Sequence, residues 1–250
     1  MTGVRWDLTG GVGRITLDRP EVSNAVDLPT AQAFTDAVTA AESDDVRVVV
    51  LDGAGKRFCA GGDVTSFLAS DEPSKYLHEL ATVLESALRR LGYLAKPVVA
   101  GVHGAVAGAG LAFVLNADVT VAARSTKFRM AYSGIGLTPD CGVSYLLPRA
   151  IGTQRALALA VSGRTLTAEE AQEWGLVTEV VDDDAAAARV AELAETLAAG
   201  PVSALGQAKR LIKSSFDVSR EESAVDETNT IAAAVGTSEA QQLIKQFTQR

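Results

Sequence analysis

The stretch KPVVAGVHGAVAGAGLAFVLNAD, residues 96–118, organises the rest of the chain. Pro97 opens a short β-branched apolar run, which predicts a buried strand. Small residues follow between Gly104 and Gly110, and a second apolar run predicts a helix ending near Asp118. A strand, a glycine turn and a helix start direct free backbone N–H groups at one point, and residues without bulk let a ligand approach the main chain. The pattern predicts a site for an anion or for a carbonyl oxygen that gains negative charge.

Two other interpretations of this stretch are weaker. Residues 98–115 are almost wholly apolar and span a length typical of a membrane helix, but His103, the strand pattern and the glycine cluster favour a core element of a soluble protein. The glycines at 101, 104, 108 and 110 do not follow the G-x-G-x-x-G pattern and lie far from any N-terminal strand, which argues against a dinucleotide loop.

The composition is that of an ordinary globular protein. The chain has 250 residues, of which 47% are hydrophobic and 22% charged, enough for one main domain with a sizeable core. Its formal net charge of −8 argues against nucleic acid or an anionic membrane surface as a partner. A phosphate-bearing ligand would need local basic groups, and we expect most candidate clusters to be solvated. These clusters are Lys56-Arg57, Arg89-Arg90 and Lys209-Arg210.

Cysteine usage and the N-terminus favour a reducing cytoplasm. Cys59 and Cys141 are too few for a disulfide framework, and the first ten residues contain no apolar signal-peptide region. Both cysteines lie in the loops suspected of function, but we expect them to be small buried residues and not redox groups.

The alternation of strand and helix patterns predicts an α/β fold. We expect strands at 4–8, 12–17, 46–51, 97–100, 119–123 and 177–181, and an extended segment at 126–132. We expect helices at 29–41, 74–93 and 148–161, the last with a break at Gly152-Thr153. Thr167 and Glu170 form a capping-box pattern that opens a further helix to Trp174. From residue 183 the chain has only helical patterns. We therefore expect a core domain at 1–182 and a helical region at 183–250 that caps the core or mediates assembly.

Two loops that follow predicted strands are rich in Gly and Ala, one at residues 60–62 and one at residues 108–110. If the two strands are neighbours, each loop can supply a backbone N–H to a shared point. Two such groups form an oxyanion hole, which stabilises a thioester oxygen as it gains charge during proton abstraction next to the carbonyl. The alternative is that the small residues only allow tight helix–sheet packing.

At these residues the chain resembles the enoyl-CoA hydratase/isomerase, or crotonase, superfamily, and the resemblance runs the whole length. The matching segments are R-P-x-x-x-N-A at 19–25, F-x-A-G-x-D at 58–63, the second glycine loop and its closing A-D at 103–118, L-P-R-x-x-G at 147–152, and A-x-E-A-x-x-W-G-L-V at 168–177. The resemblance implies a spiral of ββα units, a helical C-terminal region, and a homotrimer or hexamer. It also implies a coenzyme A thioester as the small-molecule ligand, with no metal and no cofactor beyond the coenzyme A moiety.

The resemblance also implies which residues form the site. Gly62 and Ala109 fall where the family places its two oxyanion N–H groups, and Lys56 and Arg57 are candidates for the coenzyme A phosphates. The candidate substrate-binding residues are Asn24, Ala60, Gly61, Gly62, Asp63, Val64, Gly108, Ala112 and Tyr132.

Departures from the family pattern bear on the reaction. Typical hydratases carry two glutamates, and the corresponding positions here are Ala112 and Tyr132. Neither residue can act as a carboxylate base. Hydration needs one group to activate water and another to deliver a proton to the α carbon, so the sequence disfavours it.

Asp140, in the segment LTPDCG at 137–142, resembles the acid of the family's isomerases, nearest to the phenylacetate-pathway epoxide/enoyl isomerases and the Δ3,Δ2-enoyl-CoA isomerases. Double-bond migration needs one base, which takes a proton from C2 and returns it to C4 through a dienolate. The alternative for Asp140 is a turn residue after proline. We therefore expect an enoyl-CoA isomerase, the alternatives being an enoyl-CoA hydratase of fatty-acid β-oxidation and a catalytically silent acyl-CoA-binding protein.

Overall fold

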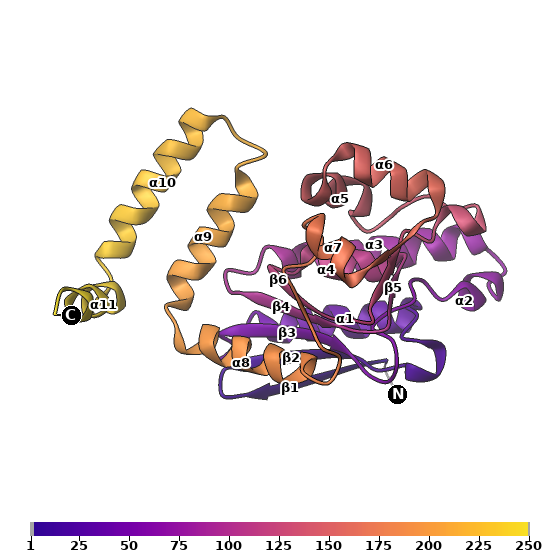
Figure 1. The fold of residues 1–250 in the computed structure, drawn as a ribbon, viewed down its shortest axis with the longest axis horizontal. Helices are drawn as coiled ribbons and strands as arrows, with labels where there is room; N and C mark the ends of the chain where they lie inside the picture. The colour runs from indigo at the N-terminus through magenta and orange to yellow at the C-terminus, as the bar shows by residue number, and fades with distance from the viewer. Residues whose placement is uncertain (1–2, 250) are drawn as a thin grey trace.

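Buried β-branched runs form a central sheet between helices in the computed structural model, which describes residues 3–249 (Figure 1). The strands of this sheet are β1 (Val4–Thr9), β2 (Val12–Leu17), β3 (Val48–Gly53), β4 (Val98–Val102), β6 (Val119–Ala123) and β9 (Glu179–Val181). Among the described residues their order is β1-β2-β3-β4-β6-β9, with β1 antiparallel to β2 and every other pair parallel. The predicted α/β class is confirmed.

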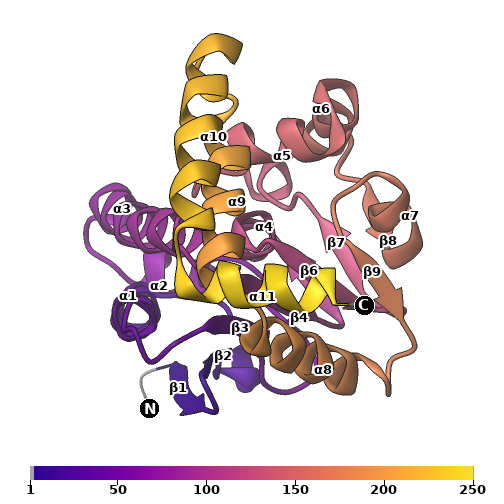
Figure 2. The ribbon, with the colours of Figure 1, turned by 90° about the vertical axis from the view of Figure 1, so that its left-hand side faces the viewer.

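Helices cover both faces of the sheet, which explains the continuous apolar runs of its parallel strands. On one face, α8 (Ala186–Ala199) packs its Val190 and Ala194 on the β3 residues Val48 and Val50. The other face is covered by α1 (Leu28–Ala41), α3 (Pro73–Gly92) and α4 (Ala109–Asn116), and Figure 2 shows α8 across the sheet from α3. There the ring of Phe113 meets that of Phe34 edge to face, with centroids 5.0 Å apart.

A second, smaller sheet follows the organising stretch. It consists of β5 (Ala105–Ala107), β7 (Lys127–Arg129) and β8 (Thr165–Thr167). The sequence predicted a continuous glycine turn where β5 lies. Gly104 and Gly108, with φ of 63° and 52°, flank the short strand in conformations that glycine adopts readily, and Val106 between them is fully buried. The run at 98–115 is thus divided among β4, β5 and α4, and no helix among the described residues is long and apolar enough to cross a membrane.

The remaining elements combine helices that the sequence predicted with short ones that it did not. They are η1 (Pro20–Val22), α2 (Val64–Leu68), η2 (Ser133–Ile135), α5 (Val143–Ile151), α6 (Thr153–Ser162) and α7 (Ala168–Glu173). The capping box of Thr167 and Glu170 is present at α7. The helix predicted at 148–161 begins earlier, at Val143, because a left-handed Gly142 starts it and Pro148 is tolerated inside α5.

The last helices form an arm that stands beside the body (Figure 1). They are α9 (Val202–Ser214), α10 (Arg220–Val235) and α11 (Ser238–Thr248). The boundary at residue 182 stays a prediction. In the structure the first helix after that boundary, α8, covers the sheet, whereas α10 and α11 have no buried residue among those described.

A buried ion pair anchors the arm to the organising stretch. The Lys209 ammonium lies 2.7 Å from an Asp118 carboxylate oxygen, and its side chain is only 8% exposed. The same carboxylate oxygen accepts the Val98 backbone N–H at 2.8 Å. Burial lowers the pKa of Lys209 to about 8, even though Asp118 favours its charged form. Lys209 is therefore an exception to the expectation that most of the basic clusters are solvated.

We expect Asp118→Asn to destabilise the protein by about 3 kcal/mol, because it leaves the buried Lys209 ammonium without its anionic partner. The midpoint of urea unfolding measures this. Asp182→Asn is the matched control: Asp182 pairs with Arg124 at 3.0 Å, but its side chain is 74% exposed, so no measurable change is expected. Equal midpoints for the two variants would contradict a buried anchor.

Candidate active site

Two glycine-containing segments approach each other more closely than side chains would allow. They pair through Cys59, whose N–H donates to the Ala105 carbonyl at 3.1 Å and whose carbonyl accepts from Ala107 at 3.0 Å. A Cβ atom on Gly110 would lie 2.6 Å from the Cys59 carbonyl oxygen, and one on Gly61 would lie 3.1 Å from the Ala107 carbonyl oxygen. The two glycine loops noted in the sequence are therefore neighbours.

This approach brings two unpaired backbone donors to one cavity. The N–H groups of Gly62 and Ala109 have no hydrogen-bond acceptor within residues 3–249. Ala109 is the first residue of α4, a position whose N–H has no intrahelical partner. Both residues line the same cavity, and an ideal Cβ on Gly61 would lie 3.5 Å from the Ala109 nitrogen. The helix dipole of α4 further favours negative charge at this end.

The cavity has a volume of about 220 Å³ and mostly apolar walls. It is lined by Val26, Ala60, Gly61, Gly62, Val64, Phe67, Leu77, Leu80, Leu84, Gly108, Ala109, Ala131, Tyr132, Ile135, Leu137 and Asp140. Among these residues Asp140 alone carries an ionisable carboxyl group. An apolar surround strengthens the electrostatic effect of any charge that forms inside.

Asp140 is held by Tyr132, whose hydroxyl donates to its Oδ1 at 2.8 Å. Burial, and then the negative charge of Asp140, raise the pKa of Tyr132, so this phenol remains a neutral donor. The turn after Asp140 is unusual because Cys141 has a φ of +50°, a left-handed conformation that is rare for cysteine. Its thiol is buried, and burial raises its pKa.

Both cysteines are buried and free, as the sequence predicted. Burial raises the pKa of Cys59 to about 12, which keeps it a neutral thiol at physiological pH. Among the described residues, no group of three or more His, Cys, Asp or Glu side chains lies together as a metal site requires.

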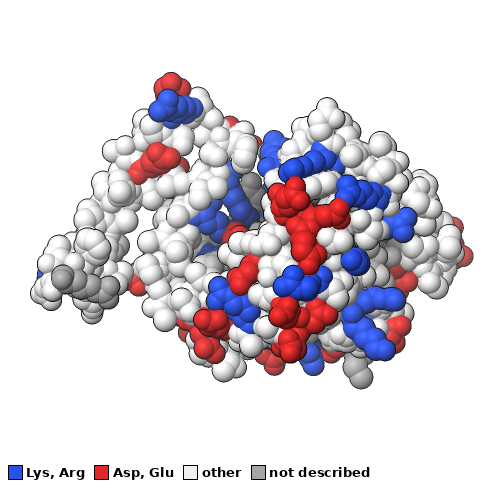
Figure 3. All heavy atoms as spheres, in the orientation of Figure 1, with Lys and Arg blue, Asp and Glu red and all other residues white. Residues whose placement is uncertain are grey.

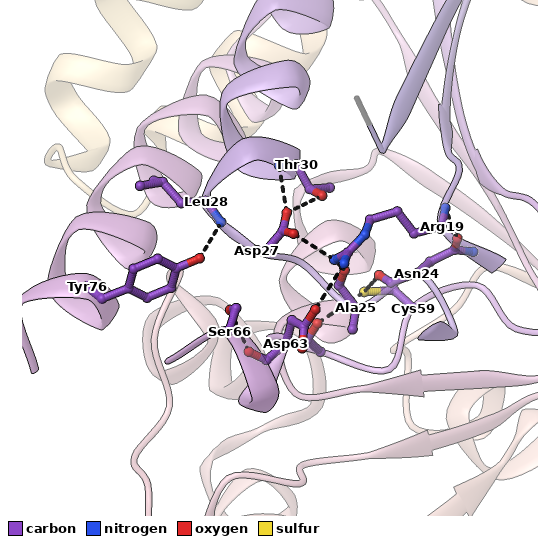
Figure 4. Close-up of polar contacts among 11 residues, drawn as sticks. Arg19, Asn24, Ala25, Asp27, Leu28, Thr30, Cys59, Asp63, Ser66 and Tyr76 are labelled. Carbon is purple, nitrogen blue, oxygen red and sulfur yellow. Dashed lines mark hydrogen bonds and ion pairs between the residues drawn. The ribbon is translucent and has the colours of Figure 1, made fainter. Parts of the chain in front are cut away.

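Arg19 fixes the loop that carries the Gly62 N–H (Figure 4). Its guanidinium donates to the Ala25 carbonyl at 2.7 Å and pairs with Asp27 at 3.2 Å and Asp63 at 3.0 Å. Asp63 directly follows Gly62, so its ion pair restrains the position of that donor. Asp63 itself does not line the cavity.

The side-chain amide of Asn24 makes its hydrogen bonds within the fold. Its side chain is buried, and its Nδ2 donates to the carbonyl oxygens of residues 54, 57 and 58 at 2.9, 2.8 and 3.0 Å. Its Oδ1 accepts the Arg19 backbone N–H at 2.8 Å. Asn24 has a φ of +55°, which asparagine tolerates better than most residues. The asparagine of the early motif therefore joins two loops, and it is not among the residues that line the cavity.

The structure brings most of the predicted site residues together. Those that line the cavity are Ala60, Gly61, Gly62, Val64, Gly108, Ala109, Tyr132 and Asp140. Asn24, Asp63 and Ala112 do not line it, and Ala112 is fully buried in the core. Lys56 and Arg57 are exposed, and Arg57 donates to the Ser23 hydroxyl at 2.9 Å. The roles of all these residues in binding and catalysis remain predictions.

Sequence reasoning missed the apolar wall of the cavity. The sequence predicts Leu77, Leu80 and Leu84 only as part of the apolar face of the helix at 74–93, and Phe67 lies in α2, a short helix that the sequence does not predict. Helical periodicity identifies a buried face, but it does not distinguish packing against a core from lining a cavity.

Solved structures identify the fold. An enoyl-CoA hydratase from Polaromonas sp. JS666 superposes with a TM-score of 0.93 at 30% sequence identity, covering 98% of this chain and 96% of that chain. An enoyl-CoA hydratase from Mycobacterium smegmatis also gives a TM-score of 0.93, at 28% identity, covering 100% and 97%. The protein is therefore of the crotonase-fold class, as the resemblance implied.

Sequence comparison gives the family. The family model described as enoyl-CoA hydratase/isomerase matches residues 7–249. The chain is 41% identical over 209 residues to the 1,2-epoxyphenylacetyl-CoA isomerase of Escherichia coli K12, covering 82% of this chain and 79% of that protein. It is 37% identical over 187 residues to the trans-2-decenoyl-(acyl-carrier-protein) isomerase of Streptococcus mutans, covering 72% and 70%. The chain belongs to the enoyl-CoA hydratase/isomerase family.

Proposed function

We propose that the protein is an enoyl-CoA isomerase that moves a double bond within an unsaturated acyl-CoA, with Asp140 as the base. The observation that carries this proposal is a single cavity-lining carboxylate in the same cavity as two unpaired backbone N–H groups. Migration of a double bond needs one base and stabilisation of one oxyanion, and this cavity has one candidate for each.

In the proposed reaction, the thioester oxygen accepts hydrogen bonds from the Gly62 and Ala109 N–H groups. Asp140 removes a proton from C2 of the 3-enoyl chain, and the electron pair delocalises onto the thioester oxygen as a dienolate. The same carboxyl returns the proton to C4, which leaves the double bond between C2 and C3. Tyr132 occupies Oδ1 of Asp140, which leaves Oδ2 for the proton. The coenzyme A moiety of the substrate is the only cofactor that this chemistry needs.

Hydration is the second candidate, because enzymes of this name are among the structural neighbours. It needs two acid–base groups, whereas the positions of the missing glutamates hold a core alanine, Ala112, and a tyrosine already bonded to Asp140. The unpaired donors support a bound ligand in either case, because an enclosed N–H without a partner costs stability unless a ligand fills its place. The carboxyl group of Asp140 in the same cavity favours an enzyme over a catalytically silent acyl-CoA-binding protein.

The shape of the cavity, the basic residues and the free thiols support proposals for the acyl group, the coenzyme A contacts and the location. The apolar walls and the volume of about 220 Å³ suit a compact unsaturated or aromatic acyl group, and the E. coli relative is named for a phenylacetyl thioester. In a chain with a net charge of −8, the exposed Lys56 and Arg57 are the proposed partners of the coenzyme A phosphates. Two free thiols suit the proposed cytoplasmic location.

We also propose a homotrimer or hexamer. Val225, Ile231 and Phe247 on the arm are 63%, 71% and 79% exposed in the single chain. Figure 3 shows that the arm presents few charged side chains on the face in view. Apolar surface of this kind is typical of a face that another chain covers.

Asp140→Asn keeps the shape of the side chain and removes the base. We expect it to lower the rate of double-bond migration in 3-enoyl-CoA by about 10²–10⁴-fold, the usual contribution of a positioned base, while acyl-CoA affinity stays near wild type. Thioester absorbance and calorimetry measure the two quantities. Asp71→Asn, an exposed carboxyl outside the cavity, is the control and should be neutral. Migration at the wild-type rate, or hydration of 2-enoyl-CoA by wild type faster than migration, would sink the proposal.

Ala109→Pro removes one of the two donors at a helix position where proline is otherwise tolerated. We expect turnover to fall by about a hundredfold to a thousandfold. Ser238→Pro, at the first position of α11 and remote from the cavity, controls for the effect of proline itself. Unchanged turnover in a folded Ala109→Pro variant would show that its N–H does not bind the oxyanion.

Light scattering at micromolar concentration tests the assembly. We expect a mass of three or six times the 26.0 kDa of one chain. Ile231→Lys should shift the mass toward the single chain because it places a charge on the apolar face, whereas Thr82→Lys, on an exposed part of α3, should not. A wild-type mass of one chain would refute the assembly.

A further inference from the structure

Tyr132 connects the carboxylate of the cavity with the glycine loop before α4. Its side chain is only 9% exposed and lines the cavity, and its hydroxyl donates to Oδ1 of Asp140 at 2.8 Å. Tyr132 follows β7, in which the Arg129 carbonyl accepts the Gly108 N–H at 3.2 Å. Gly108 directly precedes Ala109, one of the two unpaired donors. The side chain that holds Asp140 is therefore tied to the backbone that carries one of these donors.

The loop between Tyr132 and Asp140 is open to solvent over much of its length. Gly134 and Gly136 are exposed, and a Cβ atom on either would meet no described atom within 4 Å apart from its chain neighbours. The Tyr132 carbonyl accepts the Leu137 N–H at 3.1 Å, and the Tyr132 hydroxyl reaches Asp140 beyond it. One buried residue thus holds the loop near its middle through the backbone and at its end through the side chain.

The phenol of Tyr132 stays a hydrogen-bond donor. Burial, and then the negative charge of Asp140, raise its pKa, so the hydroxyl keeps its proton at physiological pH. The distance of 2.8 Å is typical of a well-formed O–H···O hydrogen bond. A carboxylate that accepts this bond at Oδ1 no longer turns freely, and Oδ2 is the oxygen that remains for other chemistry.

We propose that Tyr132 is a positioning residue, which fixes the Asp140 carboxylate so that the proton taken from C2 is held on Oδ2 and returned to C4 without exchange with water. This inference rests on the proposed function, in which Asp140 is the base. The C2–H bond breaks as the Oδ2–H bond forms, and the electron pair moves onto the thioester oxygen. The Oδ2–H bond then breaks as the C4–H bond forms, and the pair returns to the carbon chain. Tyr132 touches neither carbon in this sequence and acts through Asp140.

The surroundings of Asp140 favour an internal return of the proton. The other cavity-lining residues are mostly apolar, so few groups in the cavity could relay a proton to solvent. Oδ1 is already bonded to Tyr132, which leaves water no free acceptor there. Without the hydroxyl, Oδ1 becomes free for water, and the exposed loop becomes free to move with Asp140.

Tyr132→Phe removes the hydroxyl and keeps the ring in the cavity wall. We expect kcat for 3-enoyl-CoA to fall by about 10- to 100-fold, the usual effect of losing a hydrogen bond to a charged group, with KM near wild type. Tyr145→Phe is the matched control, since the Tyr145 hydroxyl also donates to a carboxylate, that of Asp217 at 3.1 Å, but does not line the cavity. The control should leave both constants unchanged.

Deuterium at C2 of the substrate reports where the proton goes. In ordinary water, wild type should carry part of this deuterium to C4 of the product, and Tyr132→Phe should lose it to solvent, which mass spectrometry measures. In an Asp140→Asn background, the further change Tyr132→Phe should lower the rate little more, because the two residues act as one unit. A purely structural loss would instead multiply the two effects and leave the retention of deuterium unchanged.

Values of kcat and deuterium retention in folded Tyr132→Phe equal to those of wild type would overturn the inference, as would an equal loss in Tyr145→Phe. Complete exchange of the C2 deuterium with water in wild type would overturn it too, and this test does not depend on whether Tyr132→Phe folds. Failure of wild type to move the double bond would refute the proposed function and with it this inference. Migration that depends on Asp140 but not on Tyr132 would refute this inference alone.

Discussion

The close backbone approach of the segment before α2 to the segment before α4 is the constraint on which the site depends. Gly61 and Gly110 have no side chain to hold the two segments apart, so Cys59 can pair with both ends of β5. Beneath this contact, the rings of Phe58 and Phe113 meet edge to face with centroids 6.3 Å apart. The approach places the first N–H of α4 beside the loop of Gly62, and no side-chain chemistry is needed to create this pair of donors.

The position of the Asp140 carboxylate depends on a different feature, the sharp turn that follows it in the chain. Left-handed Cys141 and Gly142 turn the chain sharply after Asp140, and a left-handed conformation at a non-glycine residue costs roughly 1–3 kcal/mol. Burial of the Cys141 side chain in the core offsets this strain. Asp140 is thereby held at the cavity by the hydrogen bond that the Tyr132 hydroxyl donates to it, and the other cavity-lining residues are mostly apolar.

The C-terminal arm is tied to the same organising stretch. Asp118, the last residue of that stretch, accepts the first N–H of β4 and pairs with Lys209 of α9. The Lys213 ammonium also lies 3.5 Å from Asp118 and donates to the Gly92 carbonyl at 2.7 Å. The arm that carries the exposed apolar surface is therefore anchored to the same stretch whose helix α4 supplies one of the two unpaired donors, which links the proposed assembly to the site.

The sequence by itself determined the α/β class, the family and the three cavity residues Gly62, Ala109 and Asp140, because local periodicity and short motifs specify these. It did not reveal β5, since three residues between glycines are too few for a periodic signal. Its assignment of Asn24 to ligand binding stays a prediction, and only the structure shows that the Asn24 side chain joins two loops. Only the tertiary structure decided which leucines of α3 line the cavity and that Tyr132 donates to Asp140. Those outcomes depend on contacts between residues far apart in the chain, and no local pattern encodes them.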